Sequence, residues 1–275
     1  MTARSAGSGG SSEVAEEAPP ALPEGFLAAA GGVNLRDLAG IELADGQPIR
    51  PGRLLRSGQL SRLDPEGRAV LQRLHLATVV DLRTTEEAER AGRCSPELAR
   101  AVLAWPLAEA IPGARAGEAW DDPGWVAEHY LELLDEGLEV LGRVVRRLAE
   151  PGGLPAVVHC SLGKDRTGVV VASLLGMLGA ADQAIVDDYV ASRPAVLAFL
   201  DRLRAELGPA SPLEAYAPVI VSVHPEAMAG FLAGVRRRHG SFAALAEEIG
   251  VAELLPTLGA ALTGPEEPFR RRGAR

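Results

Sequence analysis

The chain has 275 residues, 47% of them hydrophobic, so it is long enough to bury a sizeable core. Its net charge of −9 argues against a nucleic-acid binder, which normally carries a basic face. Its two cysteines leave no room for a disulfide framework and favour a reducing compartment.

The two ends of the chain differ in composition from its middle. Residues 1–24 are rich in Gly, Ser, Ala, Glu and Pro, so we expect them to be disordered. They lack the apolar core of a secretory signal, and the longest apolar run, 169–181, is too short to span a bilayer. The sequence therefore predicts a cytoplasmic protein without stable membrane insertion, in which 25–262 form one domain and 263–275 a loose tail.

Short strands and helices alternate in the first half of the chain. Turn residues and short apolar runs over 34–58 are typical of a small hairpin of strands. We then expect a helix capped by Asp64 with Pro65 at its first position, a buried strand over 77–82, a helix over 86–91 capped by Thr84 or Thr85, and a short strand over 102–105. Residues 106–124 are rich in proline and glycine, and a loop of this length in a compact domain is typical of a lid.

The second half of the chain is mostly helical by its periodicity. Apolar residues at steps of three and four predict an amphipathic helix over 130–148. A buried strand is expected at 156–158, a core helix over 169–178, and further helices over 182–190, 194–207, 225–239, 241–249 and 252–258. This order predicts an α/β fold with a mostly parallel central sheet flanked by helices and a helical C-terminal part, and such sheets bind ligands at the carboxyl ends of their strands.

The loop between the buried strand and the core helix suits an anion. Its backbone N–H groups have no helical partners, and the helix adds its positive end. Lys164, the sole lysine of the chain, and Arg166 add two cations, and the Arg166 fork matches two oxygens of a phosphate. Cys160 lies where a thiolate would be stabilised, and the Thr167 hydroxyl could donate to its sulfur. The loop therefore predicts a cysteine that attacks phosphorus and takes the phosphoryl group as a thiophosphate.

The residues from His159 to Gly168, HCSLGKDRTG, resemble the HCxxGxxR[ST]G signature of cysteine-dependent phosphatases, and the GKDRTG part is similar to the bacterial protein tyrosine phosphatase B type. Weaker resemblances lie at 34–38, 52–58, 80–83 and 239–242. The resemblance implies a protein-tyrosine-phosphatase-like fold and a hydrolase that needs neither metal nor cofactor. Its substrate would be phosphotyrosine, with phosphoserine, phosphothreonine and phosphoinositides as further substrates in that family, and its product inorganic phosphate.

The same resemblance implies roles for individual residues. Cys160 would attack and Arg166 would hold the phosphate. The phosphate-binding residues would be Ser161, Leu162, Gly163, Lys164, Asp165, Arg166 and Thr167. His159, Arg36 and Arg56 would support this loop, and Lys164 would add charge for a second phosphate.

The sequence leaves open which residue is the general acid. Many cysteine phosphatases place it in a Trp-Pro-Asp loop, whereas this chain has Trp-Pro-Leu at 105–107. The candidates are, in order, Asp165, Asp81, and then Asp121 or Asp122. Asp165 could instead be a structural carboxylate that pairs with Lys164 or caps the helix.

Other functions fit parts of the pattern. A nucleotide-binding Walker loop is disfavoured because its first glycine is missing and Asp165 stands where Ser or Thr should hold magnesium. A rhodanese-like sulfur transferase would not need the Arg-Thr-Gly sequence at 166–168. A phosphoinositide phosphatase remains an alternative, as does a phosphate-binding module without turnover, which the missing Trp-Pro-Asp acid favours.

Overall fold

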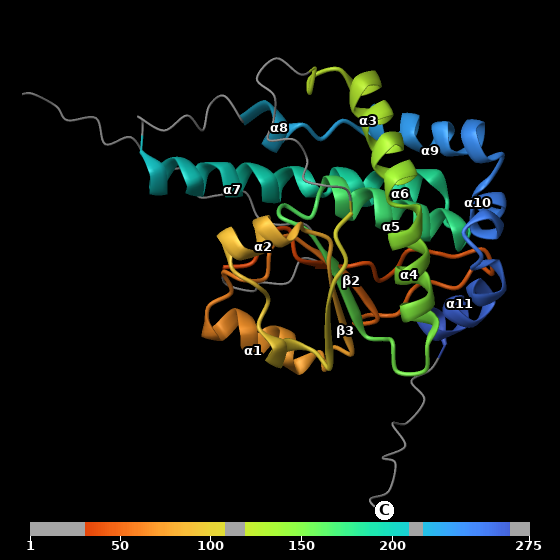
Figure 1. Cartoon of the computed structure of the whole chain (residues 1–275), viewed down its shortest axis with the longest axis horizontal. Helices are drawn as coiled ribbons and strands as arrows, with labels where there is room; N and C mark the ends of the chain where they lie inside the picture. Colours follow the sequence, from red (N-terminus) through yellow and green to blue (C-terminus); the bar gives the residue numbers. More distant parts are fainter. Residues whose placement is uncertain (1–30, 108–118, 209–216, 265–275) are drawn as a thin grey trace, which may run out of the picture.

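The computed structural model describes residues 31–107, 119–208 and 217–264, and its centre is a five-stranded sheet (Figure 1). The strands lie in the order β1-β2-β5-β3-β4. They are β1 (Arg36–Asp37), β2 (Leu54–Ser57), β3 (Thr78–Asp81), β4 (Ala101–Ala104) and β5 (Ala156–His159). All neighbours pair in parallel except β1, which is antiparallel to β2 at the edge. The predicted mostly parallel sheet is confirmed.

Helices cover both faces of this sheet (Figure 1). The α-helices are α1 (Pro65–Arg73), α2 (Thr85–Ala91), α3 (Pro123–Glu136), α4 (Leu138–Ala149), α5 (Asp165–Met177), α6 (Asp182–Val190), α7 (Ser192–Leu207), α8 (Ala217–Val221), α9 (Pro225–His239), α10 (Phe242–Glu248) and α11 (Leu255–Thr263), with 3-10 turns η1 (Pro96–Leu98) and η3 (Ala252–Leu254). Helices α1 and α2 lie on one side of the sheet, and α3–α6 and α9–α11 lie on the other (Figure 1). The predicted helical C-terminal part is therefore present.

The two faces of the sheet bury separate cores, because successive side chains of a strand point to opposite faces. Leu54 and Val158 join the large core under α3–α6 and α9–α11. Their neighbours Leu55 and Val157 join the smaller core that includes α1 and η1. All four side chains are fully buried, so β2 and β5 carry apolar residues on both faces. This explains why consecutive residues of these strands are apolar in the sequence.

The prediction of a single helix over 130–148 is wrong. The structure has two helices there, because α3 ends at Glu136 and α4 begins at Leu138. Gly137 joins them, and a Cβ atom added to it would lie 2.1 Å from Cδ1 of Leu107. The Leu107 side chain therefore occupies the joint, which only glycine leaves open. The apolar periodicity continues through both helices, so it gives no sign of the break.

Parts of the predicted loop and tails lie outside the described residues. Helix α3 begins at Pro123 and Asp122 caps it by accepting a 2.8 Å hydrogen bond from the Gly124 N–H, so the predicted lid 106–124 ends earlier than expected. Residues 108–118 and the predicted disordered segment 1–24 lie outside the described residues, so the lid and the disorder stay predictions.

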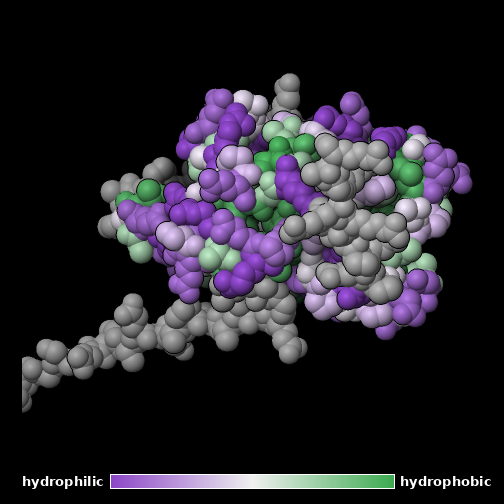
Figure 2. Space-filling view, turned by 90° about the horizontal axis from the view of Figure 1, so that it is seen from below, coloured by the Kyte–Doolittle hydropathy of each residue, from purple (hydrophilic) through white to green (hydrophobic). Residues whose placement is uncertain are grey.

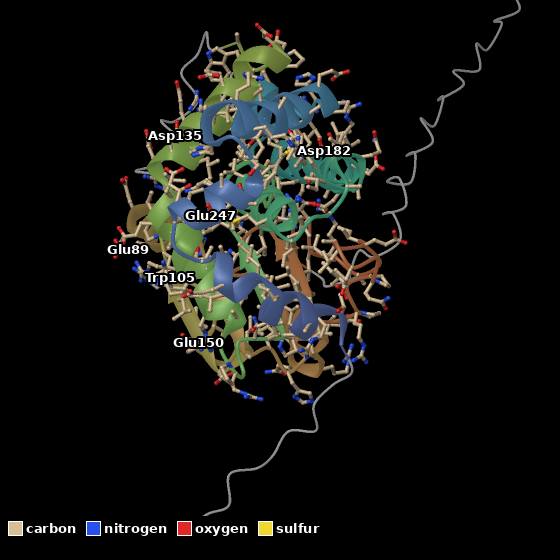
Figure 3. The ribbon with its side chains drawn as sticks, turned by 90° about the vertical axis from the view of Figure 1, so that its right-hand side faces the viewer. Glu89, Trp105, Asp135, Glu150, Asp182 and Glu247 are labelled. Carbon is tan, nitrogen blue, oxygen red and sulfur yellow. The ribbon has the colours of Figure 1, made fainter. Side chains whose placement is uncertain are left out.

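The surface carries the acidic charge of the chain on many elements. Figure 3 labels five exposed acidic residues on or next to different helices, namely Glu89, Asp135, Glu150, Asp182 and Glu247. Seen from below, the molecule is mostly hydrophilic with an apolar area near its centre (Figure 2). Among the described residues the exposed large apolar side chains are Leu197 and Leu207, both on α7. No helix in the described ranges combines the length and the apolar character needed to cross a membrane.

Candidate active site

The predicted phosphate-binding loop joins β5 to α5 at the carboxyl end of the central strand. The register of the sheet places Ser57 at the end of β2 and Asp81 at the end of β3 beside His159. Three parallel strands therefore end around this loop, at the edge where such sheets bind ligands.

Glycines let the loop lie directly on the end of β2. Gly163 has a φ of +69°, and a Cβ atom there would lie 2.4 Å from the carbonyl carbon of Ser57. A Cβ atom on Gly58 would lie 2.9 Å from the Ser161 oxygen. Larger residues at either position would push the loop away from the sheet.

The carbonyl groups of the loop are held on its outer side. The Asn34 side-chain amide donates to the oxygens of Leu162 and Gly163, at 3.1 and 3.0 Å. Arg56 donates to the Gly163 oxygen at 2.7 Å. Since the C=O and N–H of one trans peptide point in opposite directions, the N–H groups of these peptides are turned inward.

One of these inward N–H groups contacts the sulfur of Cys160. The Gly163 N–H, which belongs to the same peptide as the Leu162 oxygen, lies 3.3 Å from the Cys160 sulfur and donates to it. Helix α5 begins directly after the loop and has no side-chain cap, so its first N–H groups and its positive end remain available to an anion. The Gly163 N–H and the start of α5 are therefore both placed to bind an anion at this loop. The predicted hydrogen bond from Thr167 is not formed, since its buried hydroxyl has no partner among the described residues.

Arg166 is fixed by a carboxylate that the sequence did not reveal as a site residue. Both terminal nitrogens of Arg166 donate to Glu87, each at 2.6 Å. Ser161 also donates its hydroxyl to Glu87, at 3.1 Å. Burial alone would raise the pKa of Glu87, but the hydrogen bonds and charge of Arg166 lower it to about 2. Within the described part of the chain, the buried Nε of Arg166 has no partner, so a donor remains for a ligand.

Glu87 is positioned by the start of α2. Thr84 caps this helix in a reciprocal pair with Glu87: the Glu87 N–H donates to the Thr84 hydroxyl, and the Thr84 N–H donates to the Glu87 carboxylate. The spacing of Thr84 and Glu87 predicts this cap, but the contact with Arg166 depends on how α2 packs.

A buried ion cluster lies behind the loop. Asp188 on α6 pairs with Arg36 at 2.9 Å and also with Arg56. Burial lowers the pKa of Arg36 to about 10 against the opposing effect of Asp188. Burial would raise the pKa of Asp188, but Arg36 and Arg56 lower it below its usual value. The predicted supports Arg36 and Arg56 therefore converge on Asp188, and nothing in the sequence around Asp188 distinguishes it from a surface helix residue.

Asp165 and Lys164 are both buried beside the loop. Tyr130 donates its hydroxyl to Oδ1 of Asp165 at 2.6 Å, and Tyr189 lies 2.9 Å from the Tyr130 hydroxyl. Burial and the nearby Asp165 raise the pKa of Tyr130 well above its usual value. The Lys164 ammonium lies 3.3 Å from the same Oδ1. Two groups therefore fix the orientation of the Asp165 carboxylate.

Asp81 is held by its neighbour Arg83, which donates to both carboxylate oxygens at 2.9 and 2.7 Å. Burial would raise the pKa of Asp81, but these bonds lower it. His159 lies 3.7 Å from Asp81 and donates from Nδ1 to the Cys160 oxygen at 3.2 Å. Burial lowers the pKa of His159, so the ring is neutral at pH 7 and supports the loop by hydrogen bonding. Asp121 and Asp122, the last of the predicted candidates for the general acid, lie just before α3.

A profile of the tyrosine phosphatase family matches residues 27–262. The chain belongs to this family. It is similar to the triple specificity protein phosphatase PtpB of Mycobacterium tuberculosis, with 34% identity over 197 residues covering 60% of this chain and 68% of that protein. It is also similar to a tyrosine-protein phosphatase of Nostoc commune, with 27% identity over 143 residues covering 50% of this chain and 47% of that protein. Among solved structures, P. aeruginosa TpbA matches with a TM-score of 0.28 and 18% identity, over 73% of this chain and 90% of that one. The chain is therefore a tyrosine-protein phosphatase, a hydrolase.

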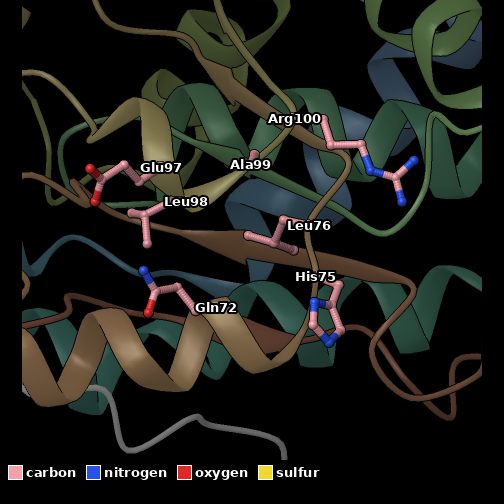
Figure 4. A pocket seen from close by; sticks show the side chains of 7 residues that line it. All are labelled: Gln72, His75, Leu76, Glu97, Leu98, Ala99 and Arg100. Atoms are coloured by element: carbon pink, nitrogen blue, oxygen red, sulfur yellow. The ribbon is translucent and has the colours of Figure 1, made fainter.

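A separate cavity of about 740 Å³ lies at the amino ends of β3 and β4, at the opposite end of these strands from the phosphate-binding loop. Gln72, Glu97 and Arg100 are among its lining residues, and Arg100 lies on the far side of it from the other two (Figure 4). Its polar groups do not converge as those of the loop do. Over the described ranges, no three His, Cys, Asp or Glu side chains are grouped so that they could hold a metal ion.

The ion pair between Glu87 and Arg166 can be tested by changing Glu87→Gln. We expect kcat/KM for p-nitrophenyl phosphate to fall roughly 10- to 100-fold, because hydrogen bonds between charged groups contribute about 1.5–3 kcal/mol. The control is Glu89→Gln, an exposed residue of the same helix, which should keep wild-type kcat/KM. An unchanged rate in Glu87→Gln would show that this pair does not position Arg166.

The same pair also gives a pH dependence to stability. The pKa of Glu87 falls from its ordinary value of 4.5 to about 2 in the folded protein, so its stabilising effect is complete above the ordinary value and is lost as pH falls toward 2. The difference in free energy of unfolding between wild type and Glu87→Gln should therefore shrink from about pH 7 to about pH 3.5 in urea titrations. A difference that grows over this interval would contradict the assignment.

The buried cluster can be tested with two equivalent changes on α6. Asp188→Asn removes the buried carboxylate that Arg36 and Arg56 share, which should lower the free energy of unfolding by about 3–5 kcal/mol in urea titrations. Asp182→Asn removes an exposed carboxylate that pairs with Arg236. This substitution should change the free energy of unfolding by at most about 1 kcal/mol. Equal effects of the two substitutions would mean that Asp188 does not hold the cluster together.

Proposed function

We propose that this enzyme hydrolyses phosphotyrosine in proteins through a thiophosphate on Cys160. The phosphate binds to the N–H groups of residues 161–166, and the Arg166 guanidinium binds its oxygens. The observation that carries the proposal is the inward peptide N–H of Gly163, which donates to the Cys160 sulfur at 3.3 Å while the carbonyl of that peptide is held outside. A cysteine surrounded in this way is suited to in-line attack on a phosphate bound to the same groups.

The reaction takes two steps. The Cys160 thiolate attacks phosphorus, the bond between phosphorus and the tyrosine oxygen breaks, and Asp165 gives its proton to the leaving oxygen. Water then attacks phosphorus, the sulfur–phosphorus bond breaks, and Asp165 accepts a proton from the water. The products are the dephosphorylated tyrosine, inorganic phosphate and the original enzyme.

The contacts of the two leading acid candidates favour Asp165. Both oxygens of Asp81 accept hydrogen bonds from Arg83. The bonds to Asp165 from Tyr130 and Lys164 both use Oδ1, and no described residue donates to Oδ2. Asp165 therefore has an oxygen available for the leaving group, next to the arginine that binds the phosphate.

The range of substrates is wider than phosphotyrosine in this proposal. The relative PtpB is a triple specificity protein phosphatase by name, and this chain is 34% identical to it over 197 residues. We extend the same breadth to this enzyme, with phosphoserine, phosphothreonine and phosphoinositides as further substrates.

The cysteine mechanism predicts that phosphate release from p-nitrophenyl phosphate and phosphotyrosine peptide continues with excess chelator and is abolished by Cys160→Ser. Phosphoserine peptide and a phosphoinositide, assayed in parallel, rank the substrates. Continued release in Cys160→Ser would eliminate the covalent mechanism, whereas binding of phosphopeptide by wild type without release from any substrate would favour a phosphate-binding module.

The role of Asp165 predicts a dependence on the leaving group. Asp165→Asn cannot donate a proton, so kcat for phenyl phosphate, a poor leaving group, should fall about 100-fold or more. The fall for p-nitrophenyl phosphate should be smaller, because this leaving group needs less protonation. If Asp165→Asn slows both substrates equally while Asp81→Asn slows only phenyl phosphate, the acid is Asp81.

A further inference from the structure

The sole lysine of the chain lies inside the protein, although it belongs to the phosphate-binding loop. The side chain of Lys164 is fully buried. Its ammonium donates to the backbone oxygens of Val219 at 2.6 Å, Ser222 at 2.8 Å and Ile220 at 3.4 Å. Lys164 therefore joins the loop to the residues at the end of α8, more than fifty positions later in the chain.

A carboxylate and an aromatic ring also lie near the Lys164 ammonium. Oδ1 of Asp165 lies 3.3 Å away, and the Trp120 ring centre lies 5.9 Å away. Trp120 is linked to the same segment, because the Ser222 hydroxyl donates to its backbone oxygen at 2.6 Å. An ammonium has three N–H donors, and three backbone oxygens and one carboxylate share them here. No donor is left for a phosphate.

The loop and the segment 219–222 depend on each other in this arrangement. A buried ammonium is unfavourable without partners, and the segment supplies most of them. Burial lowers the pKa of Lys164, and the charge of Asp165 opposes this effect. In turn, the backbone oxygens of the segment would be left without their donor if Lys164 were apolar.

We propose that Lys164 is a positioning residue that holds the segment 219–222 against the phosphate-binding loop and orients Asp165, and that it does not bind a second phosphate of the substrate. This proposal rests on the proposed function and refines its substrate class. The site recognises one phosphate at a time. A second phosphate on a neighbouring carbon gives no advantage, contrary to the role expected for Lys164 from the sequence.

The first test measures hydrogen exchange of the backbone, which needs no catalysis. In Lys164→Met, the amides of 217–224 should exchange about tenfold faster than in wild type, because the segment loses the donor that ties it to the loop. The control is Arg237→Met, which removes the same charge from an exposed residue of α9 and should leave this segment unchanged. Unchanged exchange in Lys164→Met would overturn the proposal.

The second test compares substrates with one and with two phosphates. With short-chain, soluble inositol phospholipids, Lys164→Met should lower kcat/KM by the same factor, about tenfold or more, for the monophosphate and for a bisphosphate with neighbouring phosphates. The fall should lie in kcat, because Asp165 loses its orientation, with KM little changed. A selective rise of KM for the bisphosphate would identify Lys164 as a phosphate ligand and overturn the proposal.

If Lys164→Met does not fold, Ser222→Ala tests the second attachment of the segment, to Trp120, because it keeps Lys164 and the backbone oxygen of residue 222 that Lys164 binds. It removes the bond from Ser222 to Trp120, so exchange of 217–224 should increase and kcat/KM should fall equally for both phospholipids. Wild type itself should show kcat/KM values for the two phospholipids within about threefold of each other. A bisphosphate preferred tenfold or more by wild type would contradict the proposal. If wild type releases no phosphate at all, the proposed function fails, while the exchange data still decide the structural role of Lys164.

Discussion

The site depends on the direction in which the peptides of one loop point. Asn34 and Arg56 hold the oxygens of Leu162 and Gly163 on the outer side of the loop, and the Gly163 N–H, on the opposite side of its peptide, faces the Cys160 sulfur. The rest of the fold supplies the supports: Asn34 lies just before β1, Arg56 lies on β2, and the glycines allow the close contact with β2.

These supports require charges inside the protein, and the structure buries each with a partner. Arg36 and Arg56 both pair with Asp188, and Arg166 pairs with Glu87. The Lys164 ammonium donates to backbone oxygens and lies beside the Asp165 carboxylate. The acidic groups on the surface are exposed and spread over many elements, so the negative net charge of the chain coexists with the buried cations of the site. Buried pairs contribute little net stability, but breaking one is costly, so they fix one arrangement of the loop.

Much of this arrangement could be predicted from local patterns. The alternation of apolar strands and amphipathic helices predicts the parallel sheet, and the residues from His159 to Gly168 predict the loop. The break at Gly137 is not predicted by the apolar periodicity, which continues through both helices, and the need for glycine there comes from a contact with the distant Leu107. Glu87 and Asp188 are not predicted as site residues either, because each is an ordinary helix residue that only packing brings to an arginine. The sequence predicts a ligand role for Lys164 because this residue lies in the loop expected to bind phosphate, whereas its ammonium donates to backbone oxygens at the end of α8.

The measurement that tests the central claim most directly is identification of the phosphorylated residue during turnover. Wild-type enzyme mixed with excess phosphotyrosine peptide, quenched in acid within one turnover and digested, should carry a phosphoryl group on the peptide that contains Cys160 and on no other. The thiophosphate should disappear in Cys160→Ser. Turnover at the normal rate with a phosphoryl group on another residue, or with none at any time point, would contradict the account.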